Sequence, residues 1–200
     1  MVSDNTFSSM KKNERKARQE AIISAAERVF STKPFADVSI RDIAKEAGIS
    51  HASIYRYFPD QQTLFVEAFL RGSENIISFL AELVDENKSV SIEKVTEKFL
   101  DYLIENDRYF RMMTHFMLDG SLGDELIERL NNAERLLLDQ MDKLFLKMNS
   151  KGDVGMLSHA YFAAMNGVLI TFRNYPGRSR EEVISHMRKL GKVIALKFRE

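Results

Sequence analysis

The chain is patterned as a succession of helices, and its most informative pattern lies between residues 39 and 58. Apolar residues recur there at i, i+3, i+4 and i+7, which gives a short helix one buried face. These residues are Ile40, Ile43, Ala44 and Ala47. Gly48 then favours the positive φ of a tight turn, Ile49 can fill the angle, and Ser50 can cap a second helix. The segment is therefore predicted to be a helix-turn-helix.

The second helix, residues 50–58, is too short to be stable alone, so Ile54 and Phe58 must hold it to a scaffold. Its other positions can face outward with groups that hydrogen-bond phosphate oxygens and base edges in a major groove. The outward residues are Ser50, His51, Ser53, Tyr55, Arg56 and Tyr57. DNA recognition is one interpretation of this face. A solvated face on an ordinary all-helical core is the other, and periodicity alone leaves both open.

Helical spacing continues through the rest of the chain, without persistent strand alternation or an internal repeat. A first helix is expected over 15–31, after a frayed polar start, and a long helix over 63–84 links the motif to the second part of the chain. Further helices are predicted over 92–105, 107–118, 124–148, 154–175 and 180–198. This second part is therefore expected to be an all-α domain.

The segment from about Arg15 to Phe69 resembles the DNA-binding domain of the TetR family of bacterial transcriptional regulators. The likeness is carried by Ala25, Ala26 and Phe30, by Ser39-Ile-Arg-Asp-Ile-Ala, Ala47-Gly-Ile-Ser and Ile54-Tyr-Arg-Tyr-Phe, and by Leu64-Phe. The resemblance implies an all-α fold in two parts. An N-terminal three-helix DNA-binding domain would span 11–62, and a C-terminal helical ligand-binding and dimerisation domain would span 63–200.

The outward face and the resemblance together give the expected DNA contacts. They are Ser39, Arg41, Ser50, His51, Ala52, Ser53, Tyr55, Arg56, Tyr57 and Gln61. Ser39 and Asp42 form a start signal for a helix, and by resemblance the Ser39 hydroxyl also touches a phosphate. Gln61 departs from the family pattern, because similar proteins carry a Lys there that contacts a DNA phosphate. A neutral amide gives up the charge-assisted part of that contact, so weaker or less salt-sensitive binding is expected.

The net charge is zero, with 29 Lys and Arg against 29 Asp and Glu, but the charges are unevenly distributed. Between residues 11 and 58 there are ten Lys and Arg and six Asp and Glu, a net charge of +4. Half of these basic residues form an arm at the start of the first helix: Lys11, Lys12, Arg15, Lys16 and Arg18. In similar proteins such an arm lies near the DNA backbone or minor groove. The alternative is a solvated tail that only aids solubility.

Two predicted helices, 154–175 and 180–198, carry more apolar residues than one core face needs. Gly167 on the first helix, with Gly191 and Ala195 on the second, would allow close approach. The simplest way to bury the additional apolar surface is a C2 homodimer, in which this pair of helices and its copy form a four-helix bundle, as in similar proteins. A dimer would present two recognition helices to half-sites roughly 34–36 Å apart in a palindromic operator. An ordinary monomeric core is the alternative.

Met and aromatic residues around 99–118 could line a cavity, because Met adapts its shape and aromatic rings give flat apolar walls. Similar proteins bind small inducers in this domain, so an apolar or amphipathic effector is expected. The candidate residues are Phe99, Tyr102, Phe110, Met113, His115, Met117, Tyr161, Met165, Asn166 and Phe172. Among them, His115, Tyr161 and Asn166 would supply polar contacts. A plain Met and aromatic core is the alternative.

The chain has no cysteine, which excludes disulfides, thiolate nucleophiles and Cys-based zinc sites. Its four histidines lack metal-ligand spacing, and no Ser elbow or Gly-rich phosphate loop occurs. We therefore expect no enzyme activity, no metal and no cofactor. No signal peptide or uninterrupted apolar stretch of about 18 residues is present, so a cytoplasmic protein without a membrane partner is expected.

These features together predict a ligand-responsive, homodimeric transcriptional regulator, a repressor released from double-stranded DNA by a small molecule. A ligand between residues 99 and 172 would tilt the 63–84 helix and change the separation of the recognition helices. The alternative is a helical ligand-binding or interaction module without sequence-specific DNA binding.

Overall fold

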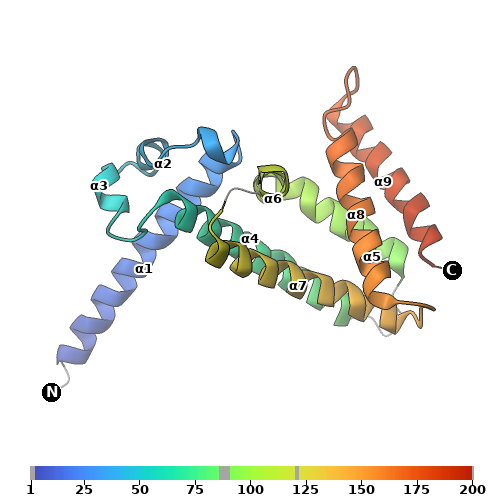
Figure 1. Ribbon diagram of the computed structural model, residues 1–200, viewed down its shortest axis with the longest axis horizontal. Coiled ribbons are helices and arrows are strands. Elements are labelled where there is room, and N and C mark those ends of the chain that lie inside the picture. The colour runs from blue at the N-terminus through green and yellow to red at the C-terminus, as the bar shows by residue number, and fades with distance from the viewer. Residues whose placement is uncertain (1–2, 86–90, 120–121, 200) are drawn as a thin grey trace. The chain divides into compact units, whose positions relative to one another are not determined.

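The computed structural model describes residues 3–85, 91–119 and 122–199, and within them every regular element is a helix (Figure 1). The expected all-α fold is thereby confirmed. The elements are α1 Ser3–Phe30, the 3-10 helix η1 Phe35–Asp37, α2 Ile40–Ala47, α3 His51–Ile54, α4 Gln61–Asp85, α5 Ile92–Glu105, α6 Asp107–Asp119, α7 Asp124–Lys147, α8 Val154–Phe172 and α9 Arg180–Lys197.

Two helices, α1 and α3, differ most from their predicted lengths. Helix α1 begins at Ser3 rather than at Arg15, so the expected fraying of residues 1–9 is wrong for those that the structure describes. Helix α3 ends at Ile54 rather than at Phe58. It stops there because the Tyr57 amide donates to the Ile54 carbonyl at 2.8 Å, three residues back, instead of continuing the i→i−4 pattern of an α-helix.

The chain packs as two compact units. The first consists of Met1–Gly72 and Arg108–Leu130, and the second of Ser73–Asp107 and Asn131–Glu200. Helices α4 and α7 each contribute residues to both units. This division describes packing, and the functional division between residues 62 and 63 stays a prediction.

The core of the first unit forms where α1 meets α2 and an aromatic cluster. Phe30 at the end of α1 and Phe35 in η1 both pack against Phe65 of α4, with ring centroids 5.0 and 5.2 Å apart in edge-to-face geometry. Such pairs add to the stabilisation from burial alone. The cluster therefore fixes η1 between α1 and α4.

Arg71 of α4 holds α4 to α1 by polar contacts. Its Nε donates to Glu27 at 2.8 Å, its Nη1 donates to Glu20 at 3.0 Å, and its Nη2 donates to the Ser24 hydroxyl at 3.1 Å. Hydrogen bonds to Glu27, and the charges of both carboxylates, raise the pKa of the Arg71 guanidinium. The first turns of α4 and the middle of α1 are thus tied together by one side chain.

In the second unit, α9 packs against both α5 and α8. Gly191 of α9 is buried, and a Cβ atom there would lie 2.4 Å from the Leu100 side chain and 3.1 Å from Thr96, both on α5. Gly191 therefore allows the close approach of α9 to α5, a neighbour that the sequence pattern did not indicate. Ala195 is also fully buried.

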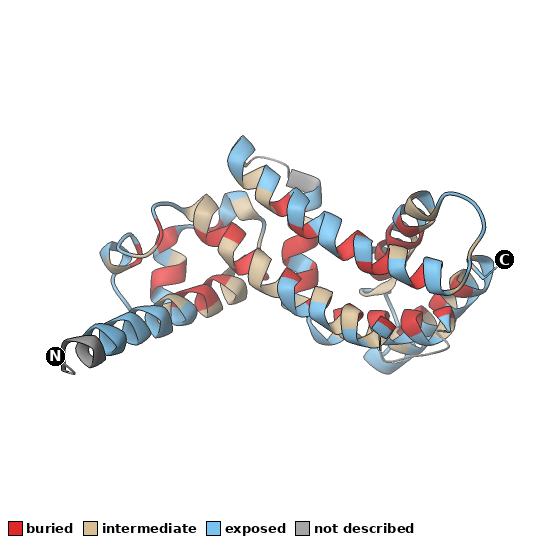
Figure 2. Cartoon of the chain, turned by 90° about the horizontal axis from the view of Figure 1, so that it is seen from below, coloured by how far each residue is buried: buried red, intermediate tan, exposed pale blue. Residues whose placement is uncertain are grey.

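Helix α8 is apolar on all sides, but only one side is covered. Its inner side buries residues such as Tyr161 and Met165, while Met156 is 65% exposed and Ile170 is 51% exposed. By length and composition α8 could also cross a membrane, a test that core helices of ordinary helical domains pass as well. Figure 2 shows the alternation of buried and exposed positions along the helices.

Candidate nucleic-acid interface

Helix α2 begins at a capping box made by Ser39 and Asp42. The Asp42 amide donates to the Ser39 hydroxyl at 3.2 Å, and the Ser39 amide donates to Asp42 Oδ2 at 2.9 Å. Lys33 Nζ donates to the same carboxylate oxygen at 3.0 Å. Hydrogen bonds from the Ser39 hydroxyl, and then from Lys33, lower the pKa of Asp42 to about 2. Ser39 thus caps its helix as predicted, with its side chain exposed.

The turn between α2 and α3 has the predicted geometry. Gly48 adopts φ 68° and ψ 28°, the left-handed conformation that glycine tolerates best. The Ile49 amide donates to the Ala44 carbonyl at 3.0 Å, although the Ile49 side chain is 38% exposed and fills the angle only in part. Ser50 caps α3 by accepting from the Ser53 amide at 3.2 Å. The predicted helix-turn-helix is therefore present in the first unit.

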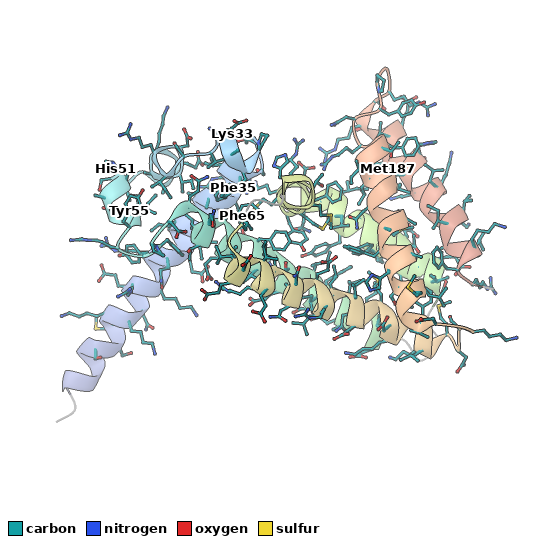
Figure 3. All side chains as sticks on the ribbon, viewed as in Figure 1. Lys33, Phe35, His51, Tyr55, Phe65 and Met187 are labelled. Atoms are coloured by element: carbon teal, nitrogen blue, oxygen red, sulfur yellow. The ribbon has the colours of Figure 1, made fainter. Side chains whose placement is uncertain are left out.

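The buried residues Ile54 and Phe58 hold α3 to its scaffold, as expected. The remaining predicted DNA contacts around α3 form an accessible face. Tyr55 is 53% exposed, and it and His51 extend from α3 in Figure 3. Exposed members of the set are Ser39, Arg41, Ser50, His51, Ala52, Tyr55 and Arg56, whereas Ser53, Tyr57 and Gln61 are half-buried.

The basic arm meets this face at Tyr57. The guanidinium of Arg15 lies over the Tyr57 ring, and Arg18 donates to Glu14 at 2.8 Å. The hydrogen bond to Glu14, and secondarily the neighbouring Tyr57, raise the pKa of Arg18. Two cations of α1 thus lie beside the residue that follows α3, an arrangement able to hold a phosphate.

Gln61 is placed differently from the other candidates. Its side-chain Nε2 donates to the backbone carbonyl of Phe35 at 3.1 Å, so one of its two amide N–H groups is engaged within the protein. A hydrogen-bond acceptor 26 residues earlier in the backbone leaves no signal in a sequence pattern.

The predicted effector residues divide between the two units. Phe110, Met113, His115 and Met117 belong to the first, and Phe99, Tyr102, Tyr161, Met165, Asn166 and Phe172 to the second. Most are buried, but Met117 is 46% exposed. In the second unit, the hydroxyls of Tyr161 and Thr96 are hydrogen-bonded at 2.7 Å, and burial raises the pKa of Tyr161.

Two grooves open on the surface of the second unit, and none of the ten predicted effector residues lines them. One lies between α5 and α9 and includes Lys94 and Arg188. The other lies between α7 and α8 and includes Asp142 and His159. Both are lined largely by polar and charged side chains, unlike the apolar cavity expected.

Buried polar atoms inside the second unit were only partly anticipated. Asn166 Oδ1 and Ser158 Oγ are buried on α8 without a hydrogen-bond partner among the described residues. Asn166 was singled out from the sequence, whereas Ser158 was not, because a lone serine in an apolar helix is usually unremarkable. Atoms of this kind are uncommon in folded proteins and mark places where a ligand could bind.

Residues 22–68 match the sequence profile of bacterial regulatory proteins of the tetR family. The chain is 43% identical over 49 residues to the HTH-type transcriptional regulator EthR of Mycolicibacterium smegmatis, a match covering 24% of this chain and 23% of EthR. It is 27% identical over 159 residues to the nucleoid occlusion factor SlmA of a Marinomonas species, covering 77% of this chain and 79% of SlmA.

Among solved structures, the fold is similar to the transcriptional regulator FadR from Bacillus subtilis in complex with stearoyl-CoA. The TM-score is 0.72 with 18% identity, over 88% of this chain and 97% of FadR. A TetR family regulator from Agrobacterium tumefaciens gives a TM-score of 0.75 with 15% identity, over 92% and 98% of the two chains.

The described part of the chain thus consists of a capped helix-turn-helix with an outward polar face, followed by further helices. Within this chain, residues 22–68 match the DNA-binding part of the TetR family, and the fold is similar to that of solved TetR family regulators.

Proposed function

We propose that this chain is a DNA-binding transcriptional repressor that binds a palindromic operator as a homodimer and releases it on binding a small molecule. The observation that carries DNA binding is the capped helix-turn-helix whose exposed face includes His51, Tyr55 and Arg56. Hydroxyl, imidazole and guanidinium groups read base edges and phosphates in a major groove. The role is regulatory rather than enzymatic, and it places the protein in the cytoplasm.

The proposed homodimer forms through the exposed apolar side of α8 and α9. Met156 and Ile170 of α8 are mostly exposed, and Val193 and Leu196 of α9 are 58% and 43% exposed. Exposed apolar side chains on two helices that pack together support association with another protein surface. At Gly167 an added Cβ would meet nothing within 4 Å, so the surface of α8 is open at this point for the close approach of a second copy.

A C2 dimer suits the proposed operator. It presents two copies of α3 to half-sites roughly 34–36 Å apart, about one turn of B-DNA. Two-fold symmetry in the protein then corresponds to a palindrome in the DNA.

The proposed effector is an apolar or amphipathic molecule bound among the C-terminal helices. The unpartnered buried atoms of Ser158 and Asn166, in an otherwise apolar interior, support a ligand with at least one polar group. Two fold neighbours were solved in complex with amphipathic or cationic small molecules, FadR with stearoyl-CoA and a regulator from Saccharomonospora viridis with choline. The predicted residues Phe99, Tyr161 and Met165 remain candidates for the apolar walls.

The proposed coupling runs through α4, because this helix contributes residues to both compact units. An effector can shift the balance between two states only by its difference in affinity for them, about 1.4 kcal/mol for each tenfold change. Mass spectrometry of small molecules that co-purify with the protein would identify the effector class.

Selection of bound fragments from random duplexes tests the proposed function. We expect an enriched palindrome whose affinity falls steeply with salt, because phosphate contacts release counterions. Sedimentation of the protein–DNA complex should give two chains per site. Absence of an enriched sequence, with residual binding insensitive to salt, would instead favour a helical module that does not read DNA.

A further inference from the structure

The backbone carbonyl of Phe35 accepts two hydrogen bonds. One comes from the Val38 amide at 3.2 Å and closes η1, and the other comes from Gln61 Nε2 in the first turn of α4 at 3.1 Å. The Phe35 ring also packs edge to face on Phe65 of α4 at 5.2 Å, and the two rings lie close together in Figure 3. Both the backbone and the side chain of Phe35 are therefore held by α4.

The segment held in this way leads directly to the start of α2. Only Ala36, Asp37 and Val38 separate Phe35 from Ser39, and Val38 is buried. A short connection anchored at Phe35 and at Val38 leaves little freedom for the residue that comes next. The position of the Phe35 carbonyl thus sets where the amide and hydroxyl of Ser39 lie.

We propose that Gln61 is a positioning residue for DNA binding, which acts through the Phe35 carbonyl on the N-terminus of α2 instead of touching DNA. The inference rests on the proposed DNA-binding function and deepens it. At the position where similar proteins carry a phosphate-binding lysine, this inference gives Gln61 the role of positioning the N-terminus of α2. Gln61 is half-buried, and one of the two N–H groups of its side-chain amide is engaged by the Phe35 carbonyl, which favours an internal role over an external one.

The variant Gln61→Met tests the proposal, because it keeps the length and approximate shape of the side chain but has no donor. In the free protein we expect amide hydrogen exchange at Val38 to rise about fivefold, the effect of losing one ordinary hydrogen bond. Operator affinity should fall about fivefold to tenfold. A second variant, Gln61→Glu, should do the same, since a carboxylate cannot donate at neutral pH.

Gln62→Met is the matched control. Gln62 is the next residue of the same turn, is also half-buried, and its side chain accepts from the Gly123 amide at 3.4 Å. We expect this variant to leave both Val38 exchange and operator affinity unchanged. Urea unfolding of each variant separates a local effect from a general loss of stability.

A double-mutant cycle with Ser39→Ala distinguishes positioning from direct contact. If Gln61 acts on Ser39, the loss of affinity from Ser39→Ala should largely disappear in the Gln61→Met background. Additive losses would mean two independent DNA contacts and would overturn the proposal, as would unchanged Val38 exchange. If the wild-type chain selects no duplex at all, the proposed DNA-binding function itself is overturned. Failure of the proposed function can therefore be distinguished from failure of the proposal for Gln61.

Discussion

The guanidinium carbon of Arg15 lies 5.9 Å from the centroid of the Tyr57 ring. This pair joins α1 to the residues that follow α3 and places a cation over the face of the Tyr57 ring. The ring contributes a cation–π contact that restrains the arginine, and the guanidinium and the Tyr57 hydroxyl can both bind an anionic oxygen. The pair is therefore the structural link between the basic arm and the helix-turn-helix.

Tyr57→Phe removes the hydroxyl and leaves the ring beneath Arg15. If the hydroxyl binds a DNA phosphate, operator affinity should fall about tenfold, since hydrogen bonds to charged groups contribute about 1.5 kcal/mol or more. Fluorescence anisotropy with a labelled operator measures the change. Tyr175→Phe, at an exposed residue after α8, is the control and should have no effect. An unchanged affinity for Tyr57→Phe would assign Tyr57 to the scaffold.

Gly167→Arg should prevent dimerisation without disturbing the protomer. A side chain at Gly167 meets nothing within 4 Å of its Cβ, so the isolated chain can accommodate it. A long cation on the apolar side of α8 would nevertheless oppose close approach of a second copy. Analytical ultracentrifugation should show a monomer for this variant. Asn131→Arg adds the same charge at an exposed site on α7 and should leave the dimer intact.

The capping box predicts a specific pH dependence. The pKa of Asp42 is about 2 in the folded protein, against an ordinary value of 3.8. A carboxyl with a lowered pKa stabilises the folded state above its unfolded pKa, and this contribution is lost as the pH falls from 3.8 to about 2. The difference in unfolding free energy between wild type and Asp42→Asn should therefore shrink across this range. An NMR titration of Asp42 gives an independent check, and a midpoint near 3.8 would contradict the prediction.

Gly191→Ala should destabilise the second unit by about 1–3 kcal/mol, because the new Cβ would overlap the Leu100 side chain in a packed core. Gly155→Ala is the matched control on α8. Its Cβ would meet only Asp153 at 3.4 Å, and alanine favours the helix over glycine. Urea unfolding should thus show changes of opposite sign in the free energy of unfolding of the two variants. Equal changes would contradict the role of Gly191 in the packing of α9 on α5.

The helices from α4 onward could be predicted from the sequence because their signals are local. Helical spacing of apolar residues marks their length, and residues such as Ser91 and Ser179 cap their first turns. Helix α5 coincides with its predicted bounds, and α9 ends one residue before its predicted end. The helix-turn-helix was also predictable, since Gly48 and Ser50 act on their immediate neighbours.

The features that the sequence did not predict either depend on contact partners far along the chain or lack the apolar pattern that marks a helix. The bond from Gln61 to the Phe35 carbonyl has a backbone acceptor, which carries no side-chain signature. Gly191 was interpreted as facing α8 or a second copy, but its environment is set by Leu100 on another helix. The beginning of α1 has no apolar stripe, so periodicity could not identify it as helical.

The exposed beginning of α1 and helix α3 would act at different stages of the proposed DNA binding, the first encounter and the bound state. Residues 8–18 are exposed and basic on balance, so under the proposed function they would attract DNA without contributing to the core (Figure 2). A charged segment outside the core increases the rate of encounter with any duplex, whatever its sequence. Under the proposed function, helix α3 would instead set how long the protein stays bound once a matching sequence is met. In this arrangement, shortening the arm would slow arrival while leaving the choice of sequence to α3.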